Sequence, residues 1–161
     1  MKTPTKGAVL ICGASIAGPA LAYWLHHYGF TVTVVEKAAA LRGGGYPIDV
    51  RGTALEVVRR MGILPQLRRN HIDSRRLTFL EDDGTAVASL PPQAMTGGAE
   101  DIEVRRGDLA DLLYRTVADD VEFVFNDSIA ELADDPDCVE VGFRSGRRRR
   151  FDLVIGADGL H

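Results

Sequence analysis

Apolar residues at the start of the chain fall into two short runs, separated by a stretch with helical periodicity. Residues 8–12 (AVLIC) have the length and uniform apolarity of a buried parallel strand. After the turn GASIAG, apolar residues recur at helical spacing, at Ile16, Ala20, Leu21, Trp24 and Leu25. Gly29 ends this helix, and residues 31–35 (TVTVV) are rich in the β-branched side chains typical of a strand. The pattern predicts a strand–helix–strand unit of a parallel sheet.

The pattern changes after this unit. Residues 37–52 are predicted to be an irregular loop, and a helix begins at Gly52 and ends at Gly62, with Leu55, Val58 and Met61 on its apolar face. Two short apolar runs, 77–80 and 86–90, flank the turn EDDGT and predict a hairpin. Residues 70–103 therefore form an antiparallel excursion inserted into the parallel fold.

The last third of the chain predicts another helix and several strands. The helix covers residues 107–117, with an apolar face formed by Leu109, Leu112, Leu113, Thr116 and Val117. Short strands are expected at 102–105, 121–125, 129–133 and 139–144. The turn DDPD joins the last two, and Cys138 is also expected to lie in a turn. The wholly apolar run 153–155 is expected to be a central parallel strand.

The glycine turn has features of a phosphate-binding site. Gly13 allows a sharp change of direction and Gly18 allows close helix packing, while the helix start offers N–H groups to a pyrophosphate. Ser15 replaces the middle glycine of the usual G-x-G-x-x-G pattern. Glu36 follows Gly18 by 18 positions, the separation at which an acid reaches a ribose hydroxyl. We predict a dinucleotide site, and the alternative is a purely structural turn.

The charged segments can be interpreted either as ordinary solvated surface or as parts of a binding site. The loop after Glu36 carries Lys37, Arg42, Asp49 and Arg51, and is either a surface connection or a cofactor-lining loop with a cation near an adenosine. The basic cluster Arg59, Arg60, Arg68 and Arg69 is interpreted as a solvated helix face. The run RRRRF at 147–151 is interpreted as an exposed β-ribbon edge rather than a nucleic-acid patch, because no aromatic residues interleave with the arginines.

Composition narrows the class of protein. The chain has 161 residues, 45% hydrophobic and 26% charged, as expected for one soluble globular domain. Its net charge of −4 gives no general attraction to nucleic acid or to an anionic membrane. The N-terminal MKTPTKG has no apolar core of a signal peptide, so a cytoplasmic location with Cys12 and Cys138 reduced is predicted. No Cys/His group has the spacing of a metal site.

Three motifs occur in a fixed order: GASIAG with Glu36, GDLADLL preceded by Arg106, and DLVIGADGLH at the end. In this order they resemble the FAD fingerprint, the R-x-x-L segment beside the flavin and the second, Asp-Gly fingerprint of the FAD-dependent aromatic hydroxylases. These are the class A flavoprotein monooxygenases with the fold of p-hydroxybenzoate hydroxylase. The segment RGGGYPIDVRGTALEVVRRMGIL resembles tetracycline-inactivating and polyketide-tailoring members. The resemblance covers essentially the whole chain.

The resemblance implies an α/β fold. It would be a Rossmann-like FAD-binding domain with a parallel sheet, an antiparallel β-meander crossover and part of an inserted antiparallel substrate-domain sheet. Residues 1–161 would form the N-terminal part of the FAD-binding domain, with 70–103 directed toward the substrate domain. The family's downstream Gly-Asp motif and the Ser-x-x-Arg that completes the Asp-Gly motif are missing, so the chain resembles a truncated, N-terminal portion.

Cofactor-binding positions follow from the resemblance residue by residue. Those implied around the pyrophosphate are Gly13, Ser15, Ile16, Ala17 and Gly18, with support from Asp158 and Gly159, which in the family also influence NAD(P)H use. Glu36 would bind the adenosine ribose, with Lys37 and Arg42 nearby. Arg106 would contact the flavin side, and Asp49 the flavin or its ribityl chain. No catalytic acid or base and no metal ligand is assigned, because the hard chemistry belongs to the flavin.

The implied activity is that of an FAD- and NAD(P)H-dependent monooxygenase. NAD(P)H would act as a transient co-substrate, and O₂ would give a flavin hydroperoxide that hydroxylates an aromatic or polyketide-like small molecule. The alternatives are a truncated, non-catalytic FAD-binding remnant and a related flavin-dependent halogenase or reductase. No nucleic-acid or membrane partner is expected, and the sequence carries no signal for an oligomeric state.

Overall fold

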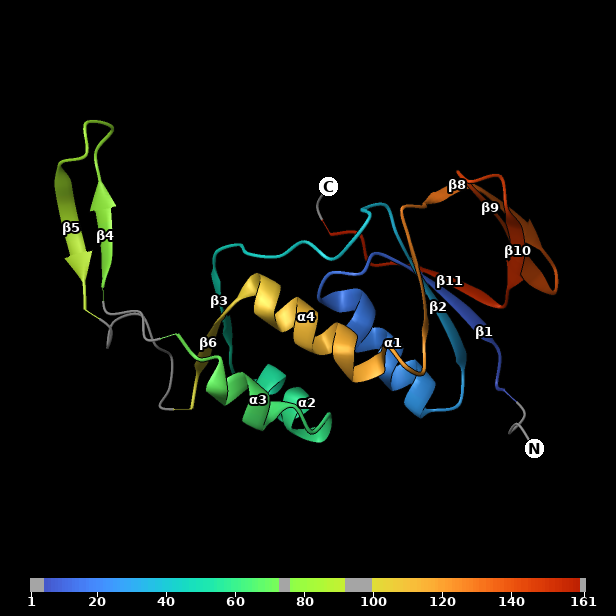
Figure 1. Cartoon of the computed structure of the whole chain (residues 1–161), viewed down its shortest axis with the longest axis horizontal. Coiled ribbons are helices and arrows are strands. Elements are labelled where there is room, and N and C mark those ends of the chain that lie inside the picture. Colours follow the sequence, from blue (N-terminus) through green and yellow to red (C-terminus); the bar gives the residue numbers. More distant parts are fainter. Residues whose placement is uncertain (1–4, 73–75, 92–99, 160–161) are drawn as a thin grey trace. The chain divides into compact units, whose positions relative to one another are not determined.

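The computed structural model describes residues 5–72, 76–91 and 100–159 (Figure 1). They form two compact units. One contains the described residues up to Gly43 and from Leu109 onward, and the other contains those of Gly44–Asp108. Each unit has its own sheets and helices.

A four-stranded parallel sheet is the centre of the first unit. Its order is β11-β1-β2-β7, with β1 at Ala8–Cys12, β2 at Thr31–Glu36, β7 at Glu122–Phe125 and β11 at Leu153–Gly156. Helix α1 (Ala17–His27) connects β1 to β2, and Gly29 follows it with a positive φ of 92°. The predicted strand–helix–strand unit is therefore confirmed.

Strand β11 lies at an edge of this sheet in the part of the chain that the structure describes. It pairs with β1 and leaves Leu153 48% exposed. The prediction of a central strand was wrong. An apolar run indicates that both faces of a strand are covered by other elements. It does not indicate whether the strand has a hydrogen-bonded neighbour on each side, which is what a central position requires.

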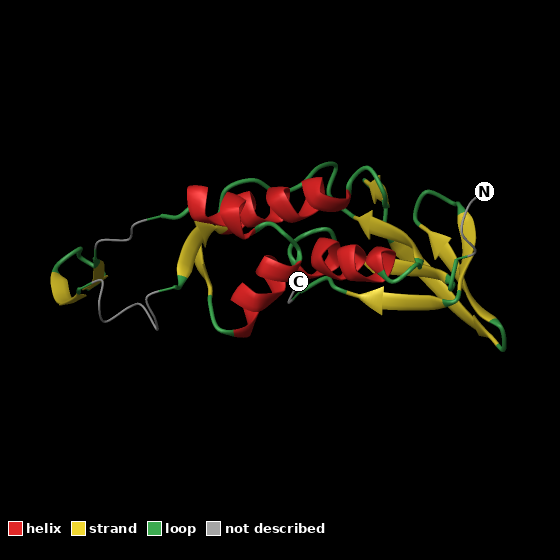
Figure 2. Cartoon of the chain, turned by 90° about the horizontal axis from the view of Figure 1, so that it is seen from below, coloured by secondary structure: helices red, strands yellow, loops and turns green. Residues whose placement is uncertain are grey.

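Two layers cover opposite faces of the parallel sheet. On one face Val9, Ile11 and Val34 pack in a cluster with Ala22 of α1 and Val117 of α4 (Arg106–Val117). On the other face lies an antiparallel sheet in the order β10-β9-β8, formed by β8 (Ile129–Asp135), β9 (Cys138–Phe143) and β10 (Arg148–Phe151). Its core residues Val141, Phe143 and Phe151 pack with Leu10 and Val35. Figure 2 shows the strands in yellow and the helices in red.

The run of arginines forms the edge of the three-stranded sheet, as predicted. Arg148 pairs with Glu131 at 2.8 Å, Arg149 with Glu122 at 2.7 Å, and Arg150 with Glu140. These ion pairs compensate the positive charge within the protein.

Buried Asp127 ties the loop after β7 to the turn between β9 and β10. Its carboxylate accepts hydrogen bonds from the Ser128 N–H (2.9 Å), the Ser145 N–H (3.0 Å) and the Ser145 hydroxyl (2.6 Å). The hydroxyl of Ser145 contributes most to holding the pKa of Asp127 below its usual range, against the opposing effect of burial. The carboxylate is therefore favoured in its charged form in the folded protein.

The second unit combines short helices with two small antiparallel sheets. Its helices are α2 (Thr53–Arg60) and α3 (Leu64–Arg69); its sheets are β3 (Pro47–Val50) with β6 (Ile102–Arg105), and β4 (Leu77–Leu80) with β5 (Ala86–Leu90). The predicted hairpin and the strand at 102–105 are confirmed.

Several predicted boundaries in the two units were wrong. Strand β3 occupies part of the expected loop 37–52, because β6, about fifty positions away in sequence, supplies its hydrogen-bonding partner. Helix α3 was not predicted, since six residues carry too little periodicity. Cys138 begins β9 rather than lying in a turn, and Asp135 still belongs to β8. Of the antiparallel excursion predicted at 70–103, residues 73–75 and 92–99 lie outside the described residues.

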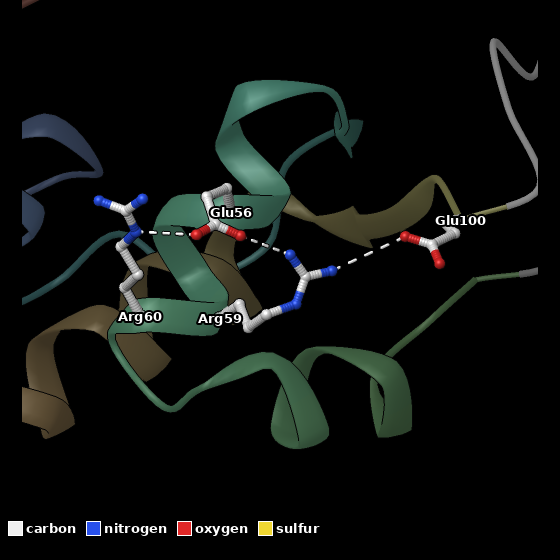
Figure 3. A network of polar contacts seen from close by, with 4 residues as sticks. All are labelled: Glu56, Arg59, Arg60 and Glu100. Atoms are coloured by element: carbon white, nitrogen blue, oxygen red, sulfur yellow. Dashed lines mark hydrogen bonds and ion pairs between the residues drawn. The ribbon is translucent and has the colours of Figure 1, made fainter.

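The basic residues of α2 form an exposed ionic network (Figure 3). Glu56 contacts Arg59 at 2.6 Å and Arg60 at 2.8 Å, and Arg59 also lies 3.7 Å from Glu100. Hydrogen bonds from Arg60 and Arg59 lower the pKa of Glu56. The four arginines of the predicted cluster are exposed, Arg59 and Arg60 on α2 and Arg68 and Arg69 on α3, so their solvated position is confirmed but they lie on two helices. Such exposed ion pairs contribute little to stability.

We predict that Asp127→Asn lowers the melting temperature by several degrees near neutral pH. Because the pKa of Asp127 is lower in the folded than in the unfolded protein, its contribution is present above the unfolded value and is lost as the pH falls through the folded value. The difference from the wild type should therefore shrink as the pH falls below about 4. Thermal unfolding followed by circular dichroism from pH 3 to 8 measures this. Asp120→Asn, at an exposed carboxylate, is the control and should change little at any pH; an equal effect of both variants would contradict the prediction.

Candidate functional site

The ends of β1 and β11 define the candidate site. The two strands are parallel neighbours, so their carboxyl ends meet at one edge of the sheet, where open α/β sheets bind ligands. The Gly13 N–H donates to the Val35 carbonyl at 2.8 Å, and the Ala157 N–H donates to the Cys12 carbonyl at 2.7 Å. These backbone bonds hold the turn after β1 between the neighbouring strand ends.

Two positions of this turn require glycine. Gly13 has φ +111°, and a Cβ atom there would lie 2.5 Å from the carbonyl oxygen of Ala157. A Cβ atom on Gly18 would overlap the carbonyl oxygen of Gly13. Helix α1 therefore approaches the turn itself more closely than any side chain would permit.

The start of α1 is suited to an anion. Its first turn contains no acidic residue, and its N-cap residue Ile16 makes no side-chain cap bond. Ser15 and Ile16, which precede the helix, are half-buried, and Ala17 is exposed at its first position. Backbone N–H groups and the positive end of the helix dipole are therefore directed toward the sheet edge, and both stabilise a phosphate group.

Glu36 is bonded into the glycine turn from the end of β2. One carboxylate oxygen, Oε2, accepts the N–H of Ala14 at 2.9 Å, and the other, Oε1, accepts the N–H of Ala38 at 2.9 Å. Each oxygen keeps acceptor capacity beyond these bonds, so the carboxylate can still accept from a hydroxyl group. The geometry places an acceptor next to the helix start, and the ribose contact stays a prediction.

A hydrogen bond that sequence reasoning missed joins the two strand ends. The Cys12 thiol donates to Oδ1 of Asp158 at 2.8 Å. Burial, together with this bond and the charge of Asp158, raises the pKa of Cys12 to about 12. The thiol therefore stays protonated at physiological pH. Its only sequence signal is the position of a cysteine directly before the first glycine, at the end of a strand.

The structure gathers one set of the predicted residues and assigns others to the second unit. Gly13, Ser15, Ile16, Ala17, Gly18, Glu36 and Asp158 surround the edge where β1, β2 and β11 end. Lys37, directly after Glu36, is exposed, as are Arg42 and Gly159. Their roles stay predictions.

Asp49 and Arg106 belong to the second unit. Asp49 lies on β3, 3.6 Å from the guanidinium of Arg51. The Arg106 N–H donates to the Tyr46 carbonyl at 3.2 Å, and a Cβ atom on Gly45 would contact the Arg106 side chain at 3.4 Å. The flavin-side roles of both residues stay predictions.

Within the described ranges, no group of three or more histidine, cysteine or acidic side chains is arranged to hold a metal ion. A membrane-crossing helix is likewise not found there, since none of the helices is both long and apolar enough.

Comparison with known proteins identifies the family. The FAD-binding domain family matches residues 6–161. An uncharacterised protein of Mycobacterium tuberculosis is 47% identical over 156 residues, which cover 95% of this chain and 42% of the relative. A flavin-dependent monooxygenase of Legionella longbeachae is 39% identical over 154 residues, which cover 95% of this chain and 39% of the relative.

Solved structures show the same fold. The tetracycline destructase Tet(55) superimposes with a TM-score of 0.82 at 39% identity, over 100% of this chain and 40% of that one. The 2,6-dihydroxypyridine-3-hydroxylase of Arthrobacter nicotinovorans, at 24% identity and a TM-score of 0.71, shares the fold. This chain spans about two fifths of the length of these relatives. It belongs to the FAD-binding domain family.

Proposed function

We propose that the chain is the N-terminal FAD-binding part of an FAD- and NAD(P)H-dependent monooxygenase that hydroxylates an aromatic or polyketide-like small molecule. The observation that carries the proposal is the turn from Gly13 to Gly18, which has no Cβ atom at its two closest backbone approaches and to which the carboxylate of Glu36 is bonded. Relatives named flavin-dependent monooxygenase support the activity. The tetracycline destructases support a tetracycline-like, polyketide type of substrate.

The residues of the sheet edge fit the diphosphate and ribose parts of FAD. The turn has no Cβ atoms at the two closest approaches, and the start of α1, which carries no acidic residue in its first turn, would supply N–H groups for a pyrophosphate. Glu36 would accept hydrogen bonds from the adenosine ribose, with Lys37 and Arg42 on the adenosine side. When bound, FAD would supply the redox chemistry that uses NAD(P)H and O₂, while the chain supplies orientation and electrostatics.

The proposal also assigns roles to residues of the second unit. Arg106 and Asp49 would face the flavin part of the cofactor. Residues 70–103 would extend toward the substrate domain, which fits the exposed apolar side chains of the β4–β5 hairpin: Leu77, Phe79, Leu80, Val87 and Leu90. We also propose a cytoplasmic location, with which the free thiols of Cys12 and Cys138 agree.

Flavin binding and turnover test the proposal directly. The purified protein, in the longest form that its gene encodes, is titrated with FAD, followed by NADPH oxidation and O₂ uptake with tetracycline as the trial substrate. We expect quenching of flavin fluorescence at one FAD per chain and NADPH oxidation that tetracycline stimulates. FAD binding without any NADPH or NADH oxidation would favour the non-catalytic remnant. Binding of NAD in preference to FAD would contradict the cofactor assignment.

Glu36→Ala should weaken FAD binding by about tenfold to a hundredfold, because two charge-assisted backbone bonds and the proposed ribose acceptor are lost together. Glu36→Gln, which keeps the size and one oxygen, should have a smaller effect. Dissociation constants from fluorescence titration measure both. Glu131→Ala is the control, because Glu131 is exposed on β8 and pairs with Arg148. Unchanged FAD affinity in Glu36→Ala would overturn the role of Glu36.

Gly18→Ala should destabilise the turn and reduce FAD binding strongly. Its Cβ atom would overlap the Gly13 carbonyl oxygen, and such overpacking costs about 1–3 kcal/mol even where neighbours can shift. Gly43→Ala is the matched control, since a Cβ atom there meets nothing within 4 Å. Chemical denaturation and FAD titration of both variants decide the question. Equal behaviour of the two alanine variants would show that α1 can move away from the turn.

A further inference from the structure

We propose that Cys12 is a positioning residue of the dinucleotide site: its thiol holds the Asp158 carboxylate and so joins the loop after β11 to the glycine turn after β1. The inference rests on the proposed function, because its consequence is measured as FAD affinity. It gives Cys12 a role that neither the glycine turn nor the Asp-Gly motif assigns to it.

The geometry of the strand ends carries the inference. Cys12 pairs in register with Gly156, and the Ala157 N–H donates to the Cys12 carbonyl at 2.7 Å, so the two backbones are already fixed at this point. The side-chain bond from Sγ to Oδ1 of Asp158, at 2.8 Å, adds a second connection one residue further along. The other carboxylate oxygen, Oδ2, lies 3.5 Å from the place of a Cβ atom on Gly156. The carboxylate is thus turned back over the strand ends.

The direction of this carboxylate matters for an anionic ligand. Asp158 is exposed at the same sheet edge as the start of α1, and a carboxylate free to swing across that edge would repel a pyrophosphate. The bond to Cys12 restricts the charge to the β1–β11 side. It also fixes the backbone of residues 157–158, which lies against Gly13 in the glycine turn.

The thiol is suited to this task because it stays neutral. The charged groups that act on Cys12 are Asp158 and Glu36, which raise its pKa, and Lys37, which lowers it; burial has the largest effect and keeps the proton on sulfur. A neutral donor anchors Asp158 without adding negative charge next to the phosphate position. Serine would keep a donor at this place, whereas alanine and valine would not.

The first experiment measures FAD affinity of position-12 variants in the longest form of the protein. We expect Cys12→Ala and Cys12→Val to weaken binding by about three- to tenfold, and Cys12→Ser to recover most of the loss. Cys138→Ala, at the start of β9, is the matched control and should bind FAD like the wild type. In an Asp158→Ala background, Cys12→Ala should have no further effect, since its partner is gone. A loss that serine does not restore, or that persists undiminished without Asp158, would overturn the inference.

A second experiment needs no cofactor. In a Cys138→Ala background, the rate of alkylation of Cys12 by iodoacetamide is measured against pH. Asp158→Asn should lower the pKa of Cys12 and accelerate alkylation at pH 8, because the neighbouring negative charge is removed. An unchanged rate profile would show that the two side chains do not interact and would overturn the inference.

The FAD titrations distinguish failure of the proposed function from failure of this inference. If the wild type binds no FAD, the proposed function fails. If it binds FAD and the position-12 variants bind it equally well, the inference alone fails.

Discussion

The close contact between Gly18 and the carbonyl group of Gly13 is the constraint on which the candidate site depends. It fixes the start of α1 directly against the end of β1, because neither position leaves room for a side chain. The Ala14 N–H then comes within 2.9 Å of Glu36 at the end of β2, and Gly13 lies against the backbone after β11. Three strand ends and one helix start are therefore arranged by a single backbone approach, and the apolar clusters on both faces of the sheet stabilise that arrangement.

The charges at this edge follow from the same arrangement. Two carboxylates lie near a helix start that would bind an anion, and each has donors within the protein: backbone N–H groups for Glu36 and a thiol for Asp158. A carboxylate that accepts such bonds is held in one direction, and the donors stabilise its negative charge. The edge can thus combine an acceptor for hydroxyl groups with donors for phosphate, as a dinucleotide requires.

Sequence reasoning predicted most of the parallel sheet and the identity of the glycine turn, because these depend on local periodicity and on the steric need for glycine. It failed where long-range pairing decides. The apolar run of β11 did not reveal its edge position among the described strands, and β3 forms because β6, far away in sequence, pairs with it. The bonds of Cys12 and Asp127 were also missed, since each joins residues brought together only by the sheet topology. Such contacts leave no spacing pattern along the chain.

The kind of residues found at the site also limits what they can do. The turn, the helix start, Glu36 and the Cys12–Asp158 pair are proposed to hold and orient a ligand, and Cys12 keeps its proton at physiological pH. A group that retains its proton is a poor general base and a poor nucleophile. In the proposed function the residues of this edge would therefore act on affinity and orientation, and the redox step would belong to the flavin. Substitutions at this edge should therefore reduce the amount of bound FAD, whereas the protein molecules that still bind FAD should react as the wild type does.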